Sequence, residues 1–455
     1  MTKSWNDTYE ELIERVKARN PGEEEFHQAV EGVLADVFAG ITEEDERGEY
    51  HRLGVFDRIV EPDRQISFRV AWQDDGGMVR VNRAHRIQFN NSLGPYKGGL
   101  RFAPSVNPSV LKFLGFEQTF KNALTGLPMG GAKGGADLDP KGLSDDEMMR
   151  FCQSLMAELH RHIGENVDVP AGDIGVSERE ISYLFGQYKR IRNRFSGILT
   201  GKGLSFGGSA GRVEATGYGA AYFVDEMLRQ AGEEIEAKRC AISGSGNVSI
   251  FCAEKLIDLG ASVVTLSDSD GTIRDDDGID SDKLAFVKQL KLDRKGRISE
   301  YADEYPNAEY LDGERPWGVD CDLAFPCATQ NELGRSDAES LVANDCLAVV
   351  EGANMPVDAE AMELLRSEGV LIGPAKAANA GGVAVSGLEQ SQNAQHMYWQ
   401  PEEVDRQLRE IMGRIHLECV ERGGGDAAER IDYVRGSNLA AFHRVSQAMV
   451  AYGAV

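Results

Sequence analysis

The sequence predicts an α/β protein with two domains, a mixed-sheet N-terminal domain and a second domain with a doubly wound parallel sheet, separated by a hinged cleft. A chain of 455 residues with 42% hydrophobic content exceeds what one core usually supports, so two domains are expected. Residues 239–268 read as strand, glycine turn, helix and strand, the order of a βαβ unit. Glycine-rich segments at 198–219 and 373–389 mark the places where the chain is expected to cross between the domains.

The N-terminal domain is expected to begin with two amphipathic helices in its first forty residues. They are interrupted at Asn20-Pro21-Gly22, because proline and glycine do not continue a helix. Their expected role is packing or subunit contact. Residues 66–89 then alternate between apolar and polar side chains around Asp74-Asp75-Gly76-Gly77, which predicts a β-hairpin.

Two further helices are predicted in this domain, at residues 144–162 and 177–190. Each begins with a serine that is followed three residues later by a glutamate, the pattern of a capping box. In a capping box the two side chains accept hydrogen bonds from backbone amides that the first turn of the helix leaves free.

Lys97, Lys121 and Lys133 are three of the sixteen lysines in the chain, and each stands in a short glycine-rich or aromatic sequence within residues 94–135. A single lysine beside glycine is usually a solvated loop residue. Three together indicate a pocket for a small dianion, because an ammonium group binds carboxylate, and a desolvated one near other cations can lose its proton near neutral pH. Two lysines could hold the ends of a dicarboxylate while the third acts as an acid or base.

The second domain contains the pattern Gly244-Ser245-Gly246-Asn247-Val248-Ser249 between a strand at 239–243 and a helix that ends near 259. A strand at 262–266 follows, and Asp268 ends it, about 20 residues beyond the turn. Gly244 permits the tight turn, Gly246 lets the backbone approach a pyrophosphate, and the helix offers its first amides to the phosphate charge. Serine replaces the third glycine of the usual motif but is still small. This unit predicts a Rossmann-like dinucleotide-binding domain.

Other segments extend this predicted domain. A helix is expected at residues 214–230, and buried parallel strands are expected within 321–328 and 346–353. The predicted boundaries are 1–205 for a substrate-binding and oligomerisation domain, 206–375 for the dinucleotide-binding domain, and 376–455 for helices that return to the first domain.

Composition excludes several classes of partner. A formal net charge of −25 opposes binding to nucleic acid or to an anionic membrane. The N-terminal residues show no leader pattern and no apolar run reaches membrane-spanning length, so a cytoplasmic protein is expected. The seven cysteines are odd in number, widely spaced and without a CxxC pair, so we expect buried thiols, no disulfide framework and no metal site.

The sequence resembles the hexameric, bacterial-type NADP-dependent glutamate dehydrogenases of the Glu/Leu/Phe/Val dehydrogenase family. The resemblance runs nearly end to end, through GPYKGGLRF, LKFLGFEQTFKNALTGLPMGGAKGG, DVPAGDIGV, TGKGLSFGGS, EATGYG, SGSGNV, CATQNEL, EGANMP and KAANAGGVAVSGLE. It implies a homohexamer that catalyses the reversible oxidative deamination of L-glutamate to 2-oxoglutarate and ammonium. The implied direction is ammonium assimilation and glutamate biosynthesis with NADPH.

The resemblance assigns the substrate-binding residues. Lys97 and Ser386 would bind the side-chain carboxylate, whereas Gln118 and Lys121, with the backbone at Gly172, would hold the α-carboxylate. Lys133 would be the catalytic lysine, since a positive pocket lowers a lysine pKa towards the working range.

Asp173 would complete the proton transfers between ammonia, water and the amine. Its position in PAGDIG, taken alone, favours a turn or helix N-terminal aspartate, and only the resemblance assigns it to catalysis.

Cofactor contacts follow from the same resemblance. The implied residues are Thr216, Gly244, Ser245, Gly246, Asn247, Val248, Asp268, Ser269, Lys291, Arg294 and Asn354. Asp268 alone favours the ribose hydroxyls of NAD. Ser269 leaves room for a phosphate, however, and Lys291 and Arg294 could supply compensating charge, so NADP is expected in preference to NAD. Asp270 departs from the pattern by adding negative charge beside the expected phosphate.

Two other functions remain open from the sequence. A leucine, phenylalanine or valine dehydrogenase would share the catalytic pair but would leave Lys97 and Ser386 unexplained, since a buried ammonium facing an aliphatic side chain has no partner. A catalytically silent nucleotide-binding subunit would be marked by loss of Lys133 or Asp173, and both residues are present.

Overall fold

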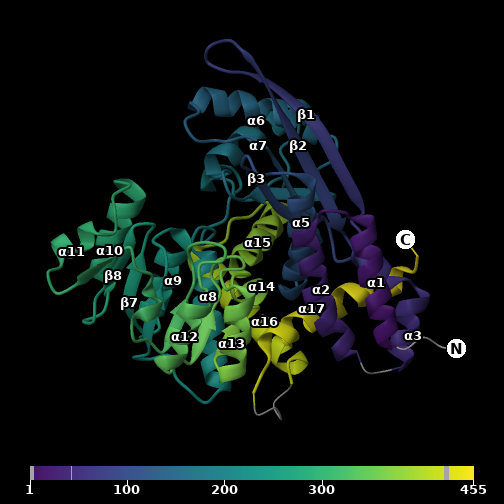
Figure 1. Cartoon of the computed structure of the whole chain (residues 1–455). Coiled ribbons are helices and arrows are strands. Elements are labelled where there is room, and N and C mark those ends of the chain that lie inside the picture. Colours follow the sequence, from purple (N-terminus) through teal and green to yellow (C-terminus); the bar gives the residue numbers. More distant parts are fainter. Residues whose placement is uncertain (1–4, 42–43, 425–429, 455) are drawn as a thin grey trace. The chain divides into compact units, whose positions relative to one another are not determined.

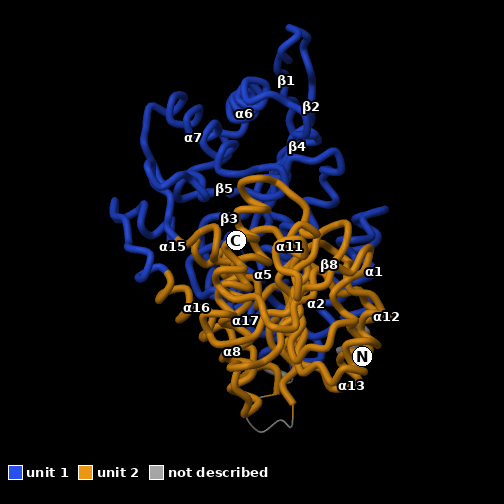
Figure 2. Tube along the Cα trace, turned by 90° about the vertical axis from the view of Figure 1, so that its left-hand side faces the viewer, with its two compact units in different colours: residues 1–210, 386–404, 438–455 blue, residues 211–385, 405–437 orange. Residues whose placement is uncertain are grey.

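The computed structural model describes residues 5–41, 44–424 and 430–454. The chain forms two compact units (Figure 2). Unit 1 comprises residues 1–210, 386–404 and 438–455, and unit 2 comprises residues 211–385 and 405–437. The boundaries predicted at 205 and 375 stay a prediction. Within the structure, residues 405–437 pack in unit 2, although we expected the whole segment from 376 onward to return to the first domain.

Unit 1 is built on a mixed five-stranded sheet, as predicted (Figure 1). Its strands are β1 (Arg64–Gln73), β2 (Val79–Asn90), β3 (Tyr96–Phe102), β4 (Gly131–Ala136) and β5 (Asp168–Gly172), in the order β1-β2-β4-β3-β5. β1 and β2 form the predicted hairpin, with Gln73 opposite Val79. β2 and β4 are antiparallel, whereas β3 runs parallel to both β4 and β5.

The helices of the N-terminal segment include the predicted ones and others, α3 to α5, that were not predicted. They are α1 (Trp5–Arg19), α2 (Glu24–Gly40), α3 (Glu44–Arg52), α4 (Val55–Ile59), α5 (Pro108–Leu124), α6 (Asp145–Leu159) and α7 (Glu178–Arg192), followed by a short 3-10 turn, η1 (Leu204–Phe206). Both predicted capping boxes are confirmed, at Ser144 with Glu147 and at Ser177 with Glu180. The predicted break near Pro21 separates α1 from α2.

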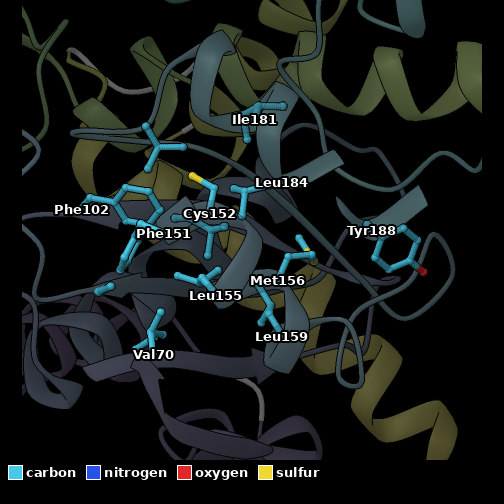
Figure 3. Packing of buried hydrophobic residues seen from close by; sticks show 14 of the residues in the cluster. Val70, Phe102, Phe151, Cys152, Leu155, Met156, Leu159, Ile181, Leu184 and Tyr188 are labelled. Atoms are coloured by element: carbon cyan, nitrogen blue, oxygen red, sulfur yellow. The ribbon is translucent and has the colours of Figure 1, made fainter. Parts of the chain in front are cut away.

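One face of the unit 1 sheet is covered by α6 and α7. Leu100 and Phe102 of β3 point from this face into a core with Phe151 and Leu155 of α6 and Leu184 of α7, all less than 5% exposed (Figure 3). Side chains alternate along a strand. The odd-numbered residues of β3, Lys97, Gly99 and Arg101, therefore belong to the opposite face.

A buried ion pair lies within the same sheet. Arg86 of β2 donates from Nε to Asp168 Oδ2 at 2.9 Å and from Nη2 to Asp168 Oδ1 at 2.5 Å, and both side chains are fully buried. The remaining nitrogen, Nη1, donates to the Gly98 carbonyl at 3.0 Å. Gln88 also donates to Asp168, at 2.9 Å. The pair therefore links β2, β3 and β5 through side chains.

Unit 2 contains a seven-stranded sheet of order β12-β11-β10-β6-β7-β8-β9. Its strands are β6 (Arg239–Ile242), β7 (Ser262–Ser267), β8 (Gly271–Arg274), β9 (Glu309–Asp312), β10 (Leu323–Phe325), β11 (Ala348–Val350) and β12 (Leu371–Gly373). The strands from β12 to β7 are parallel, and β8 and β9 add an antiparallel edge. The doubly wound, Rossmann-like prediction is confirmed, as is the unit β6, α9 (Asn247–Asp258), β7.

The other helical segments precede these strands, connect them or follow them. They are α8 (Ala215–Gln230), α10 (Ser281–Lys288), the π-turn η2 (Gln289–Asp293), α11 (Glu300–Glu304), η3 (Pro316–Gly318), α12 (Arg335–Ala343), α13 (Ala359–Glu368), α14 (Ala375–Ala378), α15 (Gly381–Gln395), α16 (Pro401–Arg422) and α17 (Tyr433–Tyr452). All seven cysteines are buried free thiols, as predicted. Within the part of the chain that the structure describes, no helix combines the length and apolar character that a membrane crossing requires.

Replacing Asp168 by alanine is expected to destabilise unit 1 by about 3–5 kcal/mol, because it leaves the buried Arg86 guanidinium without its counter-ion. Urea unfolding followed by circular dichroism measures the change. The matched control is Asp57→Ala, which breaks the exposed pair with Arg15 at 2.6 Å and is expected to cost less than about 1 kcal/mol. Equal effects of the two substitutions would contradict a structural role for the buried pair.

Candidate active site

Lys133, Asp173 and Arg101 form a charged cluster on the face of the unit 1 sheet opposite α6 and α7. Lys133 lies on β4, Arg101 on β3, and Asp173 directly follows β5. Lys133 Nζ is 3.2 Å from Asp173 Oδ1, and Arg101 Nε donates to Asp173 Oδ2 at 2.7 Å. The structure thus brings together the two residues predicted to be catalytic and adds an arginine.

Strand register explains this meeting. β3 and β4 are parallel with Arg101 beside Gly135, which places Gly99 beside Lys133. β3 and β5 are parallel with Gly99 beside Ala171, so Asp173 follows on the same face as Arg101. Gly99 must lack a side chain, because a Cβ there would lie 2.7 Å from Asp173 Cβ.

Burial and charge shift the pKa values of the pair. Burial, assisted by the nearby Arg101, lowers the pKa of Lys133 below that of an ordinary lysine, against the opposing effect of Asp173. Burial alone would raise the pKa of Asp173, but the charges of Lys133 and Arg101 outweigh it and lower that pKa. A lysine with a lowered pKa beside an ionised carboxylate is suited to proton exchange.

Lys97 lies on the same face of β3, with its side chain 1% exposed. Its Nζ donates to Thr200 Oγ1 at 2.7 Å. The buried Asn122 of α5 donates from Nδ2 to the Lys97 carbonyl at 3.0 Å and accepts a hydrogen bond from Gln118 Nε2 at 2.7 Å. The predicted ligands Lys97 and Gln118 are therefore connected through Asn122.

Thr200 is held by a buried ion pair that sequence reasoning did not identify. Lys202 Nζ lies 2.7 Å from Glu389 Oε1 of α15, with both side chains fully buried, and it also donates to the Leu199 carbonyl. The Gly201 amide donates to Glu389 Oε2 at 2.8 Å. Burial lowers the pKa of Lys202, although Glu389 opposes this. The pair fixes the turn that presents Thr200 to Lys97.

The remaining predicted substrate residues lie on elements that pack in the same unit. Ser386 is buried on α15, one residue before Gly387, where an added Cβ would lie 2.6 Å from Leu127 just beyond α5. Gly172 ends β5 beside Leu100 and directly precedes Asp173. Lys121 is half-buried on α5, one turn beyond Gln118.

Lys112 is a further lysine between residues 94 and 135, and its contacts are structural. Its Nζ lies 2.7 Å from Glu23 Oε2 and donates to Asn20 Oδ1 at 2.6 Å. It therefore ties α5 to the turn between α1 and α2.

In unit 2 the glycine turn after β6 has the geometry that the motif predicts. Gly244 has a φ of +82°, and Ser249 packs against it and donates to the Ser243 carbonyl at 2.8 Å. A Cβ at Gly246 would meet no atom of the chain within 4 Å, so the backbone borders open space at the start of α9. Asn247 and Val248 begin that 12-residue helix, and Ser245 precedes it. The turn fits a pyrophosphate at a helix N-terminus.

The end of β7 carries a charged corner. Asp268 Oδ2 accepts hydrogen bonds from Lys291 Nζ and from the Ile298 amide, each at 2.9 Å. Burial would raise the pKa of Asp268, but these two hydrogen bonds lower it. The carboxylate is therefore engaged within the chain, and Lys291 lies where the prediction placed it.

Arg297, which was not predicted from the sequence, is an arginine that contacts Ser269 and Asp270. Arg297 Nη1 donates to Ser269 Oγ at 3.0 Å, and its Nε lies 3.1 Å from Asp270 Oδ2. Arg294 instead lies over the Phe286 ring, 5.4 Å from its centre.

Two other predicted cofactor residues, Thr216 and Asn354, also belong to unit 2. Thr216 is in the first turn of α8, where its Oγ1 would lie 2.5 Å from a Cβ at Gly382. Asn354 follows β11, and its Oδ1 accepts a hydrogen bond from Asn379 Nδ2 at 3.1 Å.

The site residues that were not predicted gave only weak signals in the sequence. Arg101 and Thr200 stand inside GPYKGGLRF and TGKGLSFGGS, but no spacing rule connects either to its partner. Arg297 stands three residues beyond Arg294 in a segment without a regular period.

Known proteins share this sequence and fold. Residues 62–190 match the family model of the Glu/Leu/Phe/Val dehydrogenase dimerisation domain, and residues 207–453 match that of the Glutamate/Leucine/Phenylalanine/Valine dehydrogenases. The chain is 53% identical to the NAD(P)-specific glutamate dehydrogenase of Xylanibacter ruminicola over 443 residues, 97% of this chain and 99% of that protein. It is 51% identical to the NADP-specific glutamate dehydrogenase of Escherichia coli (strain K12) over 446 residues, 98% of each.

A solved structure agrees. The crystal structure of Plasmodium falciparum glutamate dehydrogenase matches with a TM-score of 0.95 at 49% identity, covering 99% of this chain and 95% of that chain. The chain therefore belongs to the Glu/Leu/Phe/Val dehydrogenase family.

Proposed function

We propose that this protein is an NADP-dependent glutamate dehydrogenase, which reversibly converts L-glutamate to 2-oxoglutarate and ammonium. The observation that carries the proposal is the contact of the buried Lys133 with the partly buried Asp173, on the same face of the sheet as the buried ammonium of Lys97. A proton-transfer pair beside a cation suits an amino acid with a second carboxylate.

Substrate binding follows from the cations and amides of unit 1. Lys97, with Ser386, binds the side-chain carboxylate, and Thr200 orients the Lys97 ammonium at 2.7 Å. Gln118 and Lys121 of α5 bind the α-carboxylate, assisted by the backbone at Gly172. The two carboxylates of the substrate complement the positive charges of these lysines.

Lys133 and Asp173 move the protons. When bound, NADP⁺ accepts the hydride from the α-carbon of glutamate. Asp173 first takes a proton from the substrate ammonium and releases it to water, which restores the carboxylate charge before the later steps. Uncharged Lys133 removes a proton from the water that adds to the resulting iminium carbon and returns it to the nitrogen. Lys133 then takes the proton of the hydroxyl group as the carbonyl forms and ammonia leaves. Reductive amination uses the same groups in reverse.

The cofactor fits the glycine turn of unit 2, since Gly246 leaves open space at the first amides of α9. Asn247, Val248 and Ser245 hold the phosphates, and Thr216 and Asn354 approach the nicotinamide end. Ser269 would leave room for the 2′-phosphate of NADP, and Arg297 and Lys291 would supply positive charge to it. Asp268 is a weaker competitor for a ribose hydroxyl than a free carboxylate, because Oδ2 accepts hydrogen bonds from Lys291 and the Ile298 amide and Oδ1 accepts one from the Asp270 amide.

We further propose a cytoplasmic homohexamer. The family model over residues 62–190 is described as a dimerisation domain, which supports self-association through unit 1. Exposed apolar side chains of the β1–β2 hairpin, Met78, Val79 and Val81, each more than 60% exposed, suit contact with another copy.

Substrate choice tests the proposed function most simply. Initial rates should show glutamate oxidised with NADP⁺, with far slower turnover of leucine, phenylalanine and valine. In Lys97→Leu, kcat/KM for glutamate is expected to fall about 100-fold or more, because the side-chain carboxylate loses a buried charge partner. A wild type that prefers an aliphatic or aromatic substrate would identify another dehydrogenase, and an inactive one would support the silent subunit.

Lys133→Met is expected to lower kcat by about 100- to 10,000-fold without loss of NADPH binding, because the site loses its mobile proton. Steady-state rates and cofactor fluorescence titration measure the two effects. Lys112→Met is the matched control, since Lys112 is also buried but bonded to Glu23 and Asn20. Comparable kcat in the two variants would remove Lys133 from the chemistry.

Arg297→Ala is expected to raise KM for NADPH about 10-fold or more with little change for NADH, because a charge-assisted hydrogen bond to the 2′-phosphate is lost. Arg294→Ala serves as the control and should leave the NADPH-to-NADH ratio unchanged. The opposite ranking of the two variants would place the phosphate at Arg294, as the sequence first indicated.

A further inference from the structure

Arg101 is the third member of the charged cluster, and the steps above assign it no part. Its Nε donates to Asp173 Oδ2 at 2.7 Å, and both side chains are only 16% exposed. Lys133 approaches the other oxygen, Oδ1, at 3.2 Å. The carboxylate is therefore held from two strands, with each cation on a different oxygen.

Arg101 is itself fixed by the sheet. It pairs with Gly135 in the β3–β4 register, and a Cβ at Gly135 would lie 2.2 Å from the Arg101 carbonyl oxygen. Gly99, two residues earlier on the same face, lets Asp173 pack directly against β3. The Arg101–Asp173 contact is thus part of the strand geometry.

The chemistry needs Asp173 to stay ionised and in place while Lys133 changes its charge. With Lys133 neutral, an isolated carboxylate in this buried site would tend to take up a proton or turn towards water. Arginine keeps its charge at every pH at which the enzyme works, and its planar group holds a carboxylate in one orientation. Arg101 can therefore hold Oδ2 throughout the reaction and leave Oδ1 for proton exchange.

We propose that Arg101 is a positioning residue for catalysis, which fixes the orientation and the negative charge of Asp173 while Lys133 gains and loses its proton. The inference rests on the proposed glutamate dehydrogenase function. It adds a residue that acts through Asp173 and makes no contact with the substrate carboxylates.

Other charged groups lie near Lys133 and Asp173, and the substitutions of Arg101 leave them unchanged. Arg86 of β2, bonded to Asp168, also acts on Lys133 and lowers its pKa. Helix α5, which packs on β4, carries Lys112, Glu117 and Lys121. Removal of Arg101 alone leaves Asp173 to attract the Lys133 proton without competition, so the pKa of Lys133 should rise.

Arg101→Met and Arg101→Lys test the role in the full-length enzyme. In Arg101→Met, kcat for glutamate is expected to fall about 10- to 100-fold with KM for glutamate changed less than about threefold. The acid limb of the pH–rate profile should move to higher pH. Arg101→Lys keeps the charge and should recover the wild-type pH profile with an intermediate kcat. If Arg101→Met does not fold, a wild-type kcat in Arg101→Lys would overturn the requirement for the planar group.

The matched control is Arg179→Met, because Arg179 also pairs with a buried carboxylate, Glu180, but lies on α7 behind the other face of the sheet. It should lower stability without moving the pH profile. An Arg101→Met enzyme with a wild-type kcat and pH profile would overturn the inference, as would a loss confined to KM, which would make Arg101 a substrate ligand. An inactive wild type would refute the proposed function itself, whereas an active wild type with an equally active variant would refute only the role of Arg101.

Discussion

The buried pair between Arg86 and Asp168 is the constraint on which the first unit depends. Two charges with no exposure are tolerated because Asp168 also accepts a hydrogen bond from Gln88, and Arg86 also donates to the Gly98 carbonyl. These bonds join β2, β3 and β5 on one face of the sheet. The same strands, with β4 between β2 and β3, present the catalytic cluster on the other face, so the position of Asp173 relative to Lys133 follows from the register that the pair maintains.

The two units divide the chemistry. Unit 1 supplies buried cations and one ionised carboxylate, which together favour a dicarboxylate and allow lysine to exchange a proton. Unit 2 supplies a glycine turn and a corner where Lys291 and Arg297 counter the acidic residues Asp268 and Asp270. Asp268 taken alone indicated NAD, but its carboxylate already accepts hydrogen bonds from Lys291 and from backbone amides, which weakens it as an acceptor for a ribose hydroxyl. The effect of a charged residue on cofactor choice therefore depends on the groups that are bonded to it.

Local patterns predicted much of the fold, because capping boxes, the hairpin turn and the βαβ unit depend on residues close together in the chain. The resemblance predicted Lys133 and Asp173, which the structure places 3.2 Å apart. Contacts across strands were not predictable. Arg101 and Asp173 are 72 residues apart, and Lys202 and Glu389 are 187 apart, so no periodicity connects them. Arg297, three residues beyond the predicted Arg294, contacts Ser269 in the structure, and the positive φ of Lys295 turns the chain between the two arginines; a role of Arg294 at the phosphate stays a prediction.

A crystal structure of the protein with 2-oxoglutarate bound would test the central claim most directly, because it shows where each carboxylate of the substrate lies. The account predicts one carboxylate within hydrogen-bond distance of Lys97 and the other beside Gln118 and Lys121, with the C2 carbonyl facing Lys133. A dicarboxylate bound away from β3, or a C2 carbonyl turned away from Lys133 and Asp173, would contradict the account.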